Sequence, residues 1–299
     1  MSTTPVSRPS RALVLGGGGS AGNAWLIGVI AGLSEGGLDV TEADLVIGTS
    51  AGATAAAQIA GASPTDLFAA ILDAPIPQRI DPVRPDGGAA SWMNQLERTN
   101  AIIAASADLA DMRRRSGAAA LELAAAGGEA ARDRWRETVA ARLPSRQWPE
   151  HMVHLTAVDA DTGDPVVFDR DSGVDLVDAV AASCAGGPAY RIGERRYIDG
   201  GYRRSSENAD LAGGCEQVLV LSPLGGRTRH PAEWRSDLAT QIEELEAGGC
   251  SVAKILPDED SLAAFGDNMM SPATRAPAAR AGYPQGQQVA RRLAGFWHR

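Results

Sequence analysis

The sequence predicts an α/β fold in which a mainly parallel central sheet lies between two layers of helices. Three observations lead to this prediction. Short apolar runs of strand length alternate with longer segments that have helical spacing. The strand-like runs are apolar throughout, as in parallel strands that are buried on both faces. Glycines cluster between strands and helices, which is typical of tight connections.

The first half of the chain begins with a regular alternation of strand and helix. The expected strands are 12–15 and 44–48, and the expected helices are 24–33, with Ser20 as its N-cap, and 50–62. Residues 74–92 are rich in Pro, Gly and Asp, which is typical of a long loop. Residues 94–143 have helical spacing and no strand pattern, so we expect a helical insertion there.

Strand patterns return in the second half of the chain. The expected strands are 154–158, 165–168, 196–198, 217–221 and 251–256, and the expected helices are 175–182, 231–247 and 284–296. Residues 257–285 are rich in Pro and Ala and have little pattern, so we expect them to be partly mobile. The sequence contains no internal repeat.

The composition is that of a globular chain with an acidic balance. A length of 299 residues suits one large domain or two small ones, and 44% hydrophobic residues suffice for a sizeable core. The formal net charge of −9 argues against a nucleic-acid partner, which needs a basic face, and against strong attraction to anionic membranes. We interpret the short basic cluster 113–115 as a solvated helix face.

The sequence indicates neither export nor a metal site. Cys184, Cys215 and Cys250 have no metal-ligand spacing with histidine, and their odd number favours a reducing compartment. Residues 1–11 are polar and lack the apolar region of a signal peptide, and no apolar run is long enough to cross a bilayer. We therefore expect a cytoplasmic protein without a metal or cofactor, and transient contact with a membrane surface stays open.

Gly48-Thr49-Ser50-Ala51-Gly52 is a GxSxG motif between an expected strand and an expected helix. This context is the strand–turn–helix arrangement of a nucleophile elbow. Gly48 and Gly52 let the strand and the helix pass close to each other, and the helix N-terminus stabilises negative charge that develops at the Ser50 hydroxyl. The motif predicts a nucleophilic serine, and a simple tight turn is the alternative.

A glycine-rich loop, 16–22, follows the first expected strand. Backbone N–H groups of Gly17, Gly18 and Gly19 can form an oxyanion hole, with Gly22 as the last glycine of the motif. Gly17, Gly19 and Gly22 also satisfy the GxGxxG pattern of dinucleotide-binding loops. The second strand, however, ends without the acidic residue that such sites use for the ribose, and no Gly-Lys-Ser/Thr follows to form a phosphate-binding loop.

Asp199-Gly200-Gly201 follows a short expected strand and places an aspartate in a glycine turn. A nucleophilic serine needs a base, and histidine is the usual one. The chain has four histidines, His151, His154, His230 and His298, and we interpret each of them as structural or solvent-exposed rather than catalytic. An aspartate in such a turn can reach the serine directly, although an Asp-Gly turn alone is common.

Together the three motifs resemble those of the patatin-like phospholipases. A glycine-rich loop, a GxSxG elbow and an Asp-Gly-Gly occur here in the family's order, and segments 181–184 and 208–211 add to the likeness. The resemblance covers roughly residues 12–213. In one respect the chain differs, because the family often has Arg or Lys where Ala21 precedes the last glycine of the loop.

The resemblance implies a patatin-like three-layer fold and hydrolysis of fatty-acyl esters by a Ser50–Asp199 dyad through an acyl-enzyme. It implies a catalytic domain over 12–213 that follows a flexible tail over 1–11. We expect 214–299 to supply further strands and helices to the same domain. The helical insertion 94–143 is the candidate substrate cap, because it interrupts the strand pattern between the two catalytic motifs.

Several alternatives stay open from the sequence. The chain could be an α/β-hydrolase esterase with a Ser-His-Asp triad, for which only His230 and His298 follow the aspartate. It could also be a catalytically silent module that binds a lipid, or a dinucleotide-binding protein. The headgroup, the acyl chain and the choice between phospholipid, lysolipid, glyceride and thioester stay open as well.

Overall fold

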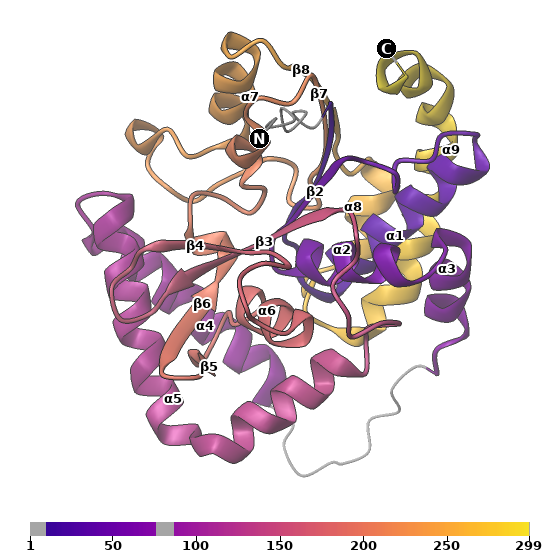
Figure 1. The fold of residues 1–299 in the computed structure, drawn as a ribbon. Helices are drawn as coiled ribbons and strands as arrows, with labels where there is room; N and C mark the ends of the chain where they lie inside the picture. The colour runs from indigo at the N-terminus through magenta and orange to yellow at the C-terminus, as the bar shows by residue number, and fades with distance from the viewer. Residues whose placement is uncertain (1–9, 76–86, 299) are drawn as a thin grey trace, which may run out of the picture.

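The centre of the molecule is an eight-stranded sheet with the order β5-β6-β3-β2-β1-β7-β8, and β4 pairs with β3. The computed structural model describes residues 10–75 and 87–298, except the side chains of 87–94 and 127 (Figure 1). The strands are β1 (Arg11–Leu15), β2 (Leu45–Gly48), β3 (Met152–Asp159), β4 (Pro165–Phe168), β5 (Tyr190–Ile192), β6 (Arg195–Asp199), β7 (Gln217–Leu221) and β8 (Ser251–Ile255).

The sheet is mainly parallel, as predicted. Strands β3, β2, β1, β7 and β8 are parallel neighbours, whereas β4 and β6 run antiparallel to β3, and β5 runs antiparallel to β6. The central strands are continuous apolar runs, and β1, β2 and β7 are buried almost throughout. The carboxyl ends of β1 and β2 lie at one edge of the sheet, where ligands bind in folds of this class.

Helices cover both faces of the sheet, which confirms the predicted α/β class. The helices are α1 (Gly19–Glu35), α2 (Ala51–Gly61), α3 (Pro64–Asp73), α4 (Gly87–Ala105), α5 (Leu109–Ala140), α6 (Leu176–Ser183), α7 (Leu238–Ala247), α8 (Glu259–Phe265) and α9 (Arg275–Trp297). Successive side chains of β1 point to opposite faces of the sheet and pack in two different cores. Leu13 and Leu15 pack in the large core with α1, α2 and α9, whereas Ala12 and Val14 pack in a smaller core with α7.

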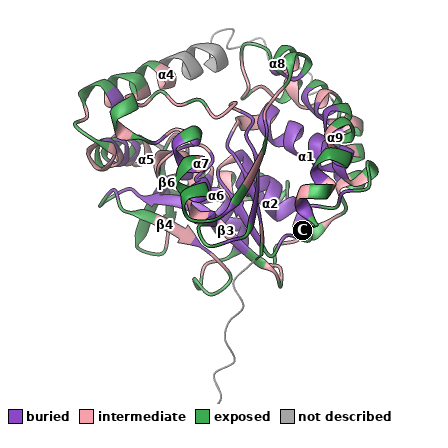
Figure 2. Cartoon of the chain, turned by 90° about the horizontal axis from the view of Figure 1, so that it is seen from above, coloured by how far each residue is buried: buried purple, intermediate pink, exposed green. Residues whose placement is uncertain are grey.

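Figure 1 shows α1, α2, α3 and α9 gathered on one side of the sheet, and α4 and α5 near the strands β5 and β6. Figure 2 shows buried residues concentrated in the central strands and in α1 and α2, with exposed residues on the outer faces of α5 and α9. Among the described helices, none has the length and apolar character needed to cross a membrane.

The close packing of α1 against α9 depends on glycines. A Cβ at Gly28 would overlap the Ala279 carbonyl, and one at Gly32 would overlap the Tyr283 carbonyl. On the other helix, a Cβ at Gly286 would overlap the Val29 carbonyl. Backbones approach this closely only when side chains are absent, so these glycines fix the distance between the two helices.

Several predicted boundaries are wrong, each for a local physical reason. Helix α1 begins at Gly19, inside the glycine run, so Gly18 rather than Ser20 is its N-cap; Gly19 has φ +63°, which glycine adopts without strain. The predicted loop 74–92 is helical from Gly87, while 76–86 lie outside the described residues. Ser10 and Arg11 are also ordered, since both of their N–H groups donate to the Asp44 carboxylate.

The segment 257–285, predicted to have little structure, contains α8 and the first half of α9. Helix α9 continues through Pro284, a residue that normally ends or bends a helix. Burial of this helix against α1 compensates for the lost backbone hydrogen bond, so packing overrides the local preference of the sequence.

Candidate active site

Ser50 lies in a sharp turn between the end of β2 and the start of α2. Its backbone has φ 54° and ψ −114°, a region that non-glycine residues rarely adopt. Two contacts hold this conformation: the Ser50 N–H donates to Ser183 Oγ at 2.9 Å, and the Cys184 thiol donates to the Ser50 carbonyl at 3.0 Å. The Ser50 turn therefore has the strained geometry and the strand–turn–helix context of a nucleophile elbow.

The two flanking glycines of the motif have the close contacts that the sequence predicts. A Cβ at Gly52 would overlap the Leu15 carbonyl of β1, and a Cβ at Gly48 would lie 2.7 Å from the Ala53 Cα. Side chains at these positions would push α2 away from the sheet. The glycines thus bring the N-terminus of α2 directly against the strands, with Ser50 between them.

Asp199 is the last residue of β6, and its side chain reaches the same place. The Gly201 N–H donates to Asp199 Oδ1 at 2.7 Å, and the Ser50 side chain is a further hydrogen-bond partner of the carboxylate. Loss of solvent around the carboxylate raises the pKa of Asp199 from 3.8 to about 6, although the hydrogen bonds from Gly201 and Ser50 oppose the rise. The geometry therefore brings Ser50 together with a carboxylate of raised basicity.

Gly200 and Gly201 form the turn that follows Asp199. A Cβ at Gly200 would overlap the backbone and hydroxyl of Thr156, so only glycine allows the turn to pack against β3. A Cβ at Gly201 would lie 3.1 Å from Asp199 Oδ1. Both glycines keep the carboxylate close to the sheet edge where Ser50 lies.

The glycine loop passes beside Ser50, since a Cβ at Gly17 would lie 3.5 Å from the Ser50 Cβ. Gly17 itself donates its N–H to the Ser206 carbonyl at 2.8 Å, so this N–H is not available to an oxyanion. Gly18 and Gly19 precede or open α1, and their N–H groups have no hydrogen-bond partner among the described residues. The available donors of the loop are therefore Gly18 and Gly19.

The other side of the loop packs on Pro223. A Cβ at Gly18 would lie 2.7 Å from the Pro223 Cβ, and one at Gly22 would lie 3.1 Å from it. The Ala21 N–H donates to the Met269 carbonyl at 2.9 Å, which ties the loop to the chain just before α9. The loop is thus held from three directions, by Ser206, Pro223 and Met269.

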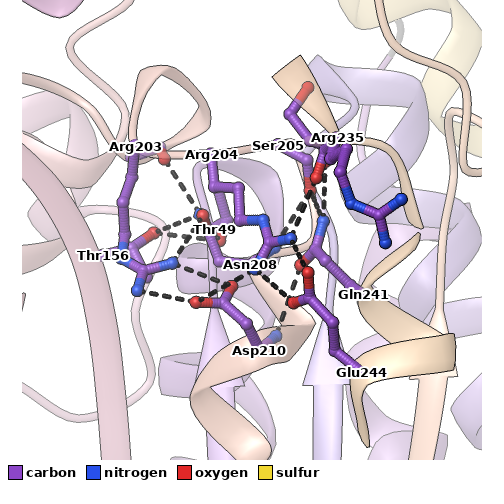
Figure 3. Close-up of polar contacts among 12 residues, drawn as sticks. Thr49, Thr156, Arg203, Arg204, Ser205, Asn208, Asp210, Arg235, Gln241 and Glu244 are labelled. Carbon is purple, nitrogen blue, oxygen red and sulfur yellow. Dashed lines mark hydrogen bonds and ion pairs between the residues drawn. The ribbon is translucent and has the colours of Figure 1, made fainter. Parts of the chain in front are cut away.

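A buried amide connects the elbow to the aspartate turn (Figure 3). Asn208 donates from Nδ2 to Thr49 Oγ1 at 3.0 Å, to Thr156 Oγ1 at 3.3 Å and to the Gly200 carbonyl at 2.9 Å. Thr49 and Thr156 are also 2.9 Å apart through their hydroxyls. These bonds link the residue before Ser50 to the residue after Asp199, so one amide fixes the spacing of both.

Asn208 is in turn held by a charged cluster. It has left-handed backbone, with φ 53°, and its Oδ1 accepts from Arg203 Nη1 at 3.2 Å. Arg203 makes a two-pronged ion pair with Asp210, at 2.9 Å and 2.8 Å (Figure 3). The ion pair with Asp210 fixes the Arg203 guanidinium, which in turn orients the Asn208 amide through the hydrogen bond to Oδ1.

A second buried group supports the glycine loop. Glu207 is fully buried, and its carboxylate accepts from the hydroxyls of Ser205 at 2.9 Å, Ser206 at 2.6 Å and Ser222 at 2.6 Å. No cation pairs with it among the described residues. The carbonyl of Ser206 accepts the Gly17 N–H, so the hydroxyls around Glu207 and the loop beside Ser50 form one hydrogen-bonded unit.

Ser50 and Asp199 both line a cavity of about 910 Å³. Its walls come from the glycine loop, the elbow, α4, α5 and the segment before α9. Apolar side chains make up much of the wall, among them Leu96, Ile103, Met112, Trp135 and Met269. The volume is at the upper end of the range for small-molecule sites, so a ligand with a long apolar portion fits.

The histidines lie elsewhere, with one exception. His154 lies near the start of β3, where it pairs with Ile47, but it does not line the cavity, and His298 follows α9. His230 lines the cavity, but its Nδ1 is 2.9 Å from Ser236 Oγ, and burial lowers its pKa. Within residues 10–75 and 87–298, no cluster of His, Cys, Asp and Glu has the arrangement of a metal site.

From the sequence we proposed roles for Ser50, Asp199 and the glycine loop, but we assigned none to Asn208 or Glu207. The available signal was the run Ser205-Ser206-Glu207-Asn208, four polar residues directly after the aspartate turn and close to the strand β7. Polar residues at such a position predict exposed loop as readily as a buried network. Burial, which separates these two cases, follows only from the tertiary structure.

Comparison with known proteins agrees with these motifs. A family model for patatin-like phospholipases matches residues 13–212. The search of curated proteins found no match.

Similar solved structures include VipD from Legionella pneumophila, with 15% identity, a TM-score of 0.43, and coverage of 96% of this chain and 67% of that chain. The type III effector protein ExoU has 17% identity, a TM-score of 0.38, and coverage of 95% and 54%. Full-length ExoU from Pseudomonas aeruginosa, in complex with SpcU, has 18% identity, a TM-score of 0.36, and coverage of 95% and 53%. The chain thus spans about half the length of the ExoU structures.

The family match begins in β1 and ends at Ala212, so it includes the glycine loop, the elbow and the aspartate turn. Two thirds of the chain lie within it, and the central parallel strands with their flanking helices are the layered fold that the motifs predicted. The chain belongs to the patatin-like phospholipase family.

Proposed function

We propose that this chain is a hydrolase of lipid acyl esters in which Ser50 is the nucleophile and Asp199 the general base. The observation that carries the proposal is the pairing of a strained serine with a carboxyl whose pKa is about 6, inside a largely apolar cavity. At neutral pH such a carboxylate is ionised and is a stronger base than an exposed aspartate.

Acylation follows from this arrangement. Asp199 accepts the proton of the Ser50 hydroxyl while Oγ attacks the ester carbonyl carbon, and the carbonyl oxygen becomes an oxyanion. The N–H groups of Gly18 and Gly19 and the N-terminus of α1 stabilise that negative charge. When the tetrahedral intermediate collapses, the C–O bond to the alcohol breaks, and protonated Asp199 returns its proton to the leaving alkoxide.

Deacylation uses the same groups in reverse order. Asp199 removes a proton from water, the resulting hydroxide attacks the acyl carbonyl, and the same N–H groups hold the oxyanion. The C–O bond to Ser50 breaks, Oγ recovers the proton from Asp199, and the fatty acid leaves. The original Ser50 proton leaves with the alcohol, and water supplies the proton that restores the Ser50 hydroxyl, so the protons balance over the cycle.

The acyl chain of the substrate would occupy the apolar part of the cavity. Helices α4 and α5 supply Leu96, Ile103, Met112 and Trp135 to this wall, which supports a role for the helical insertion as the substrate cap. Met270, 51% exposed, lies at the same cavity and offers an apolar contact with a membrane surface. We also propose a cytoplasmic location, because Cys184, Cys215 and Cys250 are all unpaired.

A fluorescent fluorophosphonate, which reacts with activated serines, tests the proposal directly. Wild type should label and Ser50→Ala should not, while Ser145→Ala, which alters a serine outside the cavity lining, should label like wild type. Equal labelling of wild type and Ser50→Ala would refute Ser50 as the nucleophile. A panel of phospholipid, lysolipid and glyceride esters with matched acyl chains then identifies the ester class.

A further inference from the structure

The cavity around Ser50 has a charge balance opposite to that of the whole chain. Of the described residues that line it, one is a carboxylate, Asp199, and five are arginines: Arg132, Arg142, Arg227, Arg229 and Arg275. The chain as a whole has a net charge of −9. A cationic cavity in an acidic protein raises the local concentration of anions, so the cavity favours ligands with negative charge.

Four of these arginines, Arg142, Arg227, Arg229 and Arg275, form no ion pair with a carboxylate among the described residues, and Arg142 and Arg275 are held by uncharged groups. Arg132 is paired with Asp133 at 2.8 Å. Arg275 donates from Nη1 to the Asn23 side-chain oxygen at 3.0 Å, and the Arg142 guanidinium lies over the Trp135 ring, 5.6 Å from its centroid. Neither contact neutralises a positive charge.

A chain of amide hydrogen bonds connects these two arginines. Arg275 donates to Asn23 Oδ1, the Asn23 amide donates to Gln58 Oε1 at 2.9 Å, and the Gln58 amide donates to the Arg142 carbonyl at 3.0 Å. Asn23 and Gln58 are buried, at 4% and 6% exposure. The connection therefore runs through the interior between α1 and α2 and links the Arg275 guanidinium to the Arg142 backbone.

Arg142 and Arg275 line the same cavity. Burial and the Arg142 charge both lower the pKa of Arg275. Two cations that face one cavity without a counter-ion carry an electrostatic cost, which a bound anion relieves. An oxyanion with several acceptor atoms suits two guanidinium forks better than a single neutral acceptor does.

The pair also lies next to the elbow. The Asn23 amide that holds Arg275 donates at 3.4 Å to the carbonyl of Ala51, the residue after Ser50. The Arg142 charge acts on Cys184, whose thiol donates to the Ser50 carbonyl. An anion between the two arginines would therefore belong to a molecule whose ester can reach Ser50.

Arg275 comes from outside the family match, which ends at residue 212. The Ala21 N–H of the glycine loop donates to the carbonyl of Met269, which lies six residues before Arg275. The segment 269–275 therefore anchors the glycine loop through Met269 and also places Arg275 in the cavity wall.

We propose that Arg275 and Arg142 form a subsite for the phosphate group of the substrate, so that the enzyme prefers phosphate-bearing lipid esters to neutral glycerides. The inference rests on the proposed function, whose Ser50 supplies the chemistry. Arg275 is the main ligand, because the Asn23 contact fixes its orientation, and Arg142 is the second ligand.

The kinetic test compares two substrates with the same acyl chain, a lysophosphatidic acid and a monoacylglycerol. Arg275→Gln should lower the ratio of kcat/KM for the phosphate substrate to that for the neutral one by about tenfold or more, as expected for loss of a charge-assisted hydrogen bond. Arg142→Gln should lower the ratio as well, and Arg275→Lys should restore part of it. Arg280→Gln, an exposed arginine of α9 outside the cavity lining, should leave the ratio unchanged.

An unchanged ratio in both Arg275→Gln and Arg142→Gln would overturn the subsite. If Arg275→Gln is unstable, Arg275→Lys alone still decides, since it keeps the charge but loses the two-pronged geometry. The subsite is also contradicted if Arg275→Lys has the same ratio of kcat/KM values as wild type and Arg142→Gln leaves that ratio unchanged.

A binding test separates this inference from the proposed function. In the Ser50→Ala protein, calorimetry should give tighter binding of lysophosphatidic acid than of monoacylglycerol, and Arg275→Gln should remove the difference. Binding of inorganic phosphate as tight as that of the lipid would assign the site to free phosphate and overturn the headgroup assignment. If the binding preference is present but wild type cleaves no ester, the proposed function fails and the anion subsite stands.

Discussion

Replacement of Asp199 by asparagine should remove activity and, at neutral pH, raise stability. Asparagine keeps the acceptor for the Gly201 N–H but cannot take a proton from Ser50. Loss of the general base should lower kcat by about 10²- to 10⁴-fold. Stability should move the other way, because wild type holds an ionised carboxylate at a site that disfavours the charged form.

The magnitude follows from the raised pKa. In the unfolded chain Asp199 loses its proton near pH 3.8, but in the folded protein it keeps the proton to about pH 6. Between these values the native state binds a proton that the unfolded state does not, so wild-type stability falls as the pH rises. At about 1.36 kcal/mol per pH unit, the rise corresponds to roughly 3 kcal/mol as an upper bound.

Urea unfolding of wild type and Asp199→Asn at several pH values between 3.5 and 7.5 (roughly the range around the two pKa values) measures this difference. The stability advantage of the variant should grow from pH 3.8 to above pH 6 and then level off. In parallel, wild-type kcat/KM should fall with unit slope below about pH 6. A stability difference independent of pH, or a rate profile flat down to about pH 4, would refute the reasoning.

Three further outcomes are expected. Asn208→Ala should cost about 1–3 kcal/mol, because Thr49, Thr156 and Gly200 each lose a buried donor, and kcat should fall while urea unfolding stays cooperative; unchanged kcat would show that the amide has no positioning role. Gly52→Ala should lower Tm and abolish fluorophosphonate labelling, since a methyl group there overlaps the Leu15 carbonyl and moves α2, and normal labelling would contradict the packing argument. His230→Gln combined with His298→Gln should retain far more activity than Asp199→Asn, and a loss as large as that of Asp199→Asn would support a histidine triad instead.

The sequence predicts the central strands well because burial on both faces leaves a strong signal. The run 217–221 coincides with β7, and 12–15 and 44–48 differ from β1 and β2 by one residue at the N-terminal end. Strand β5, Tyr190–Ile192, was not predicted, because a three-residue edge strand with an exposed arginine at its centre has no apolar pattern. A short edge strand forms because it pairs with its neighbour, and the local sequence pattern does not reveal that pairing.

Helix α9, in contrast, was predicted poorly from the sequence. The sequence predicts this helix only from residue 284, yet it runs from Arg275 to Trp297 because glycines of α1 allow its backbone to pack at close range. The candidate site divides in the same way. Ser50 and Asp199 belong to motifs with local glycines, whereas Asn208 and Arg275 contact residues far away in the sequence, and no local pattern indicates those contacts.

The place of β1 in the sheet has a consequence for assembly. It lies between β2, which is near in sequence, and β7, which is about 200 residues away, and the helix after β1 is covered by α9. The glycine loop joins that strand to that helix, so neither of its anchors is complete before residues 217–297 have folded. A partly folded chain would therefore hold Ser50 without an ordered oxyanion loop, and hydrolytic competence should emerge late, together with the final docking of α9 rather than with formation of the elbow.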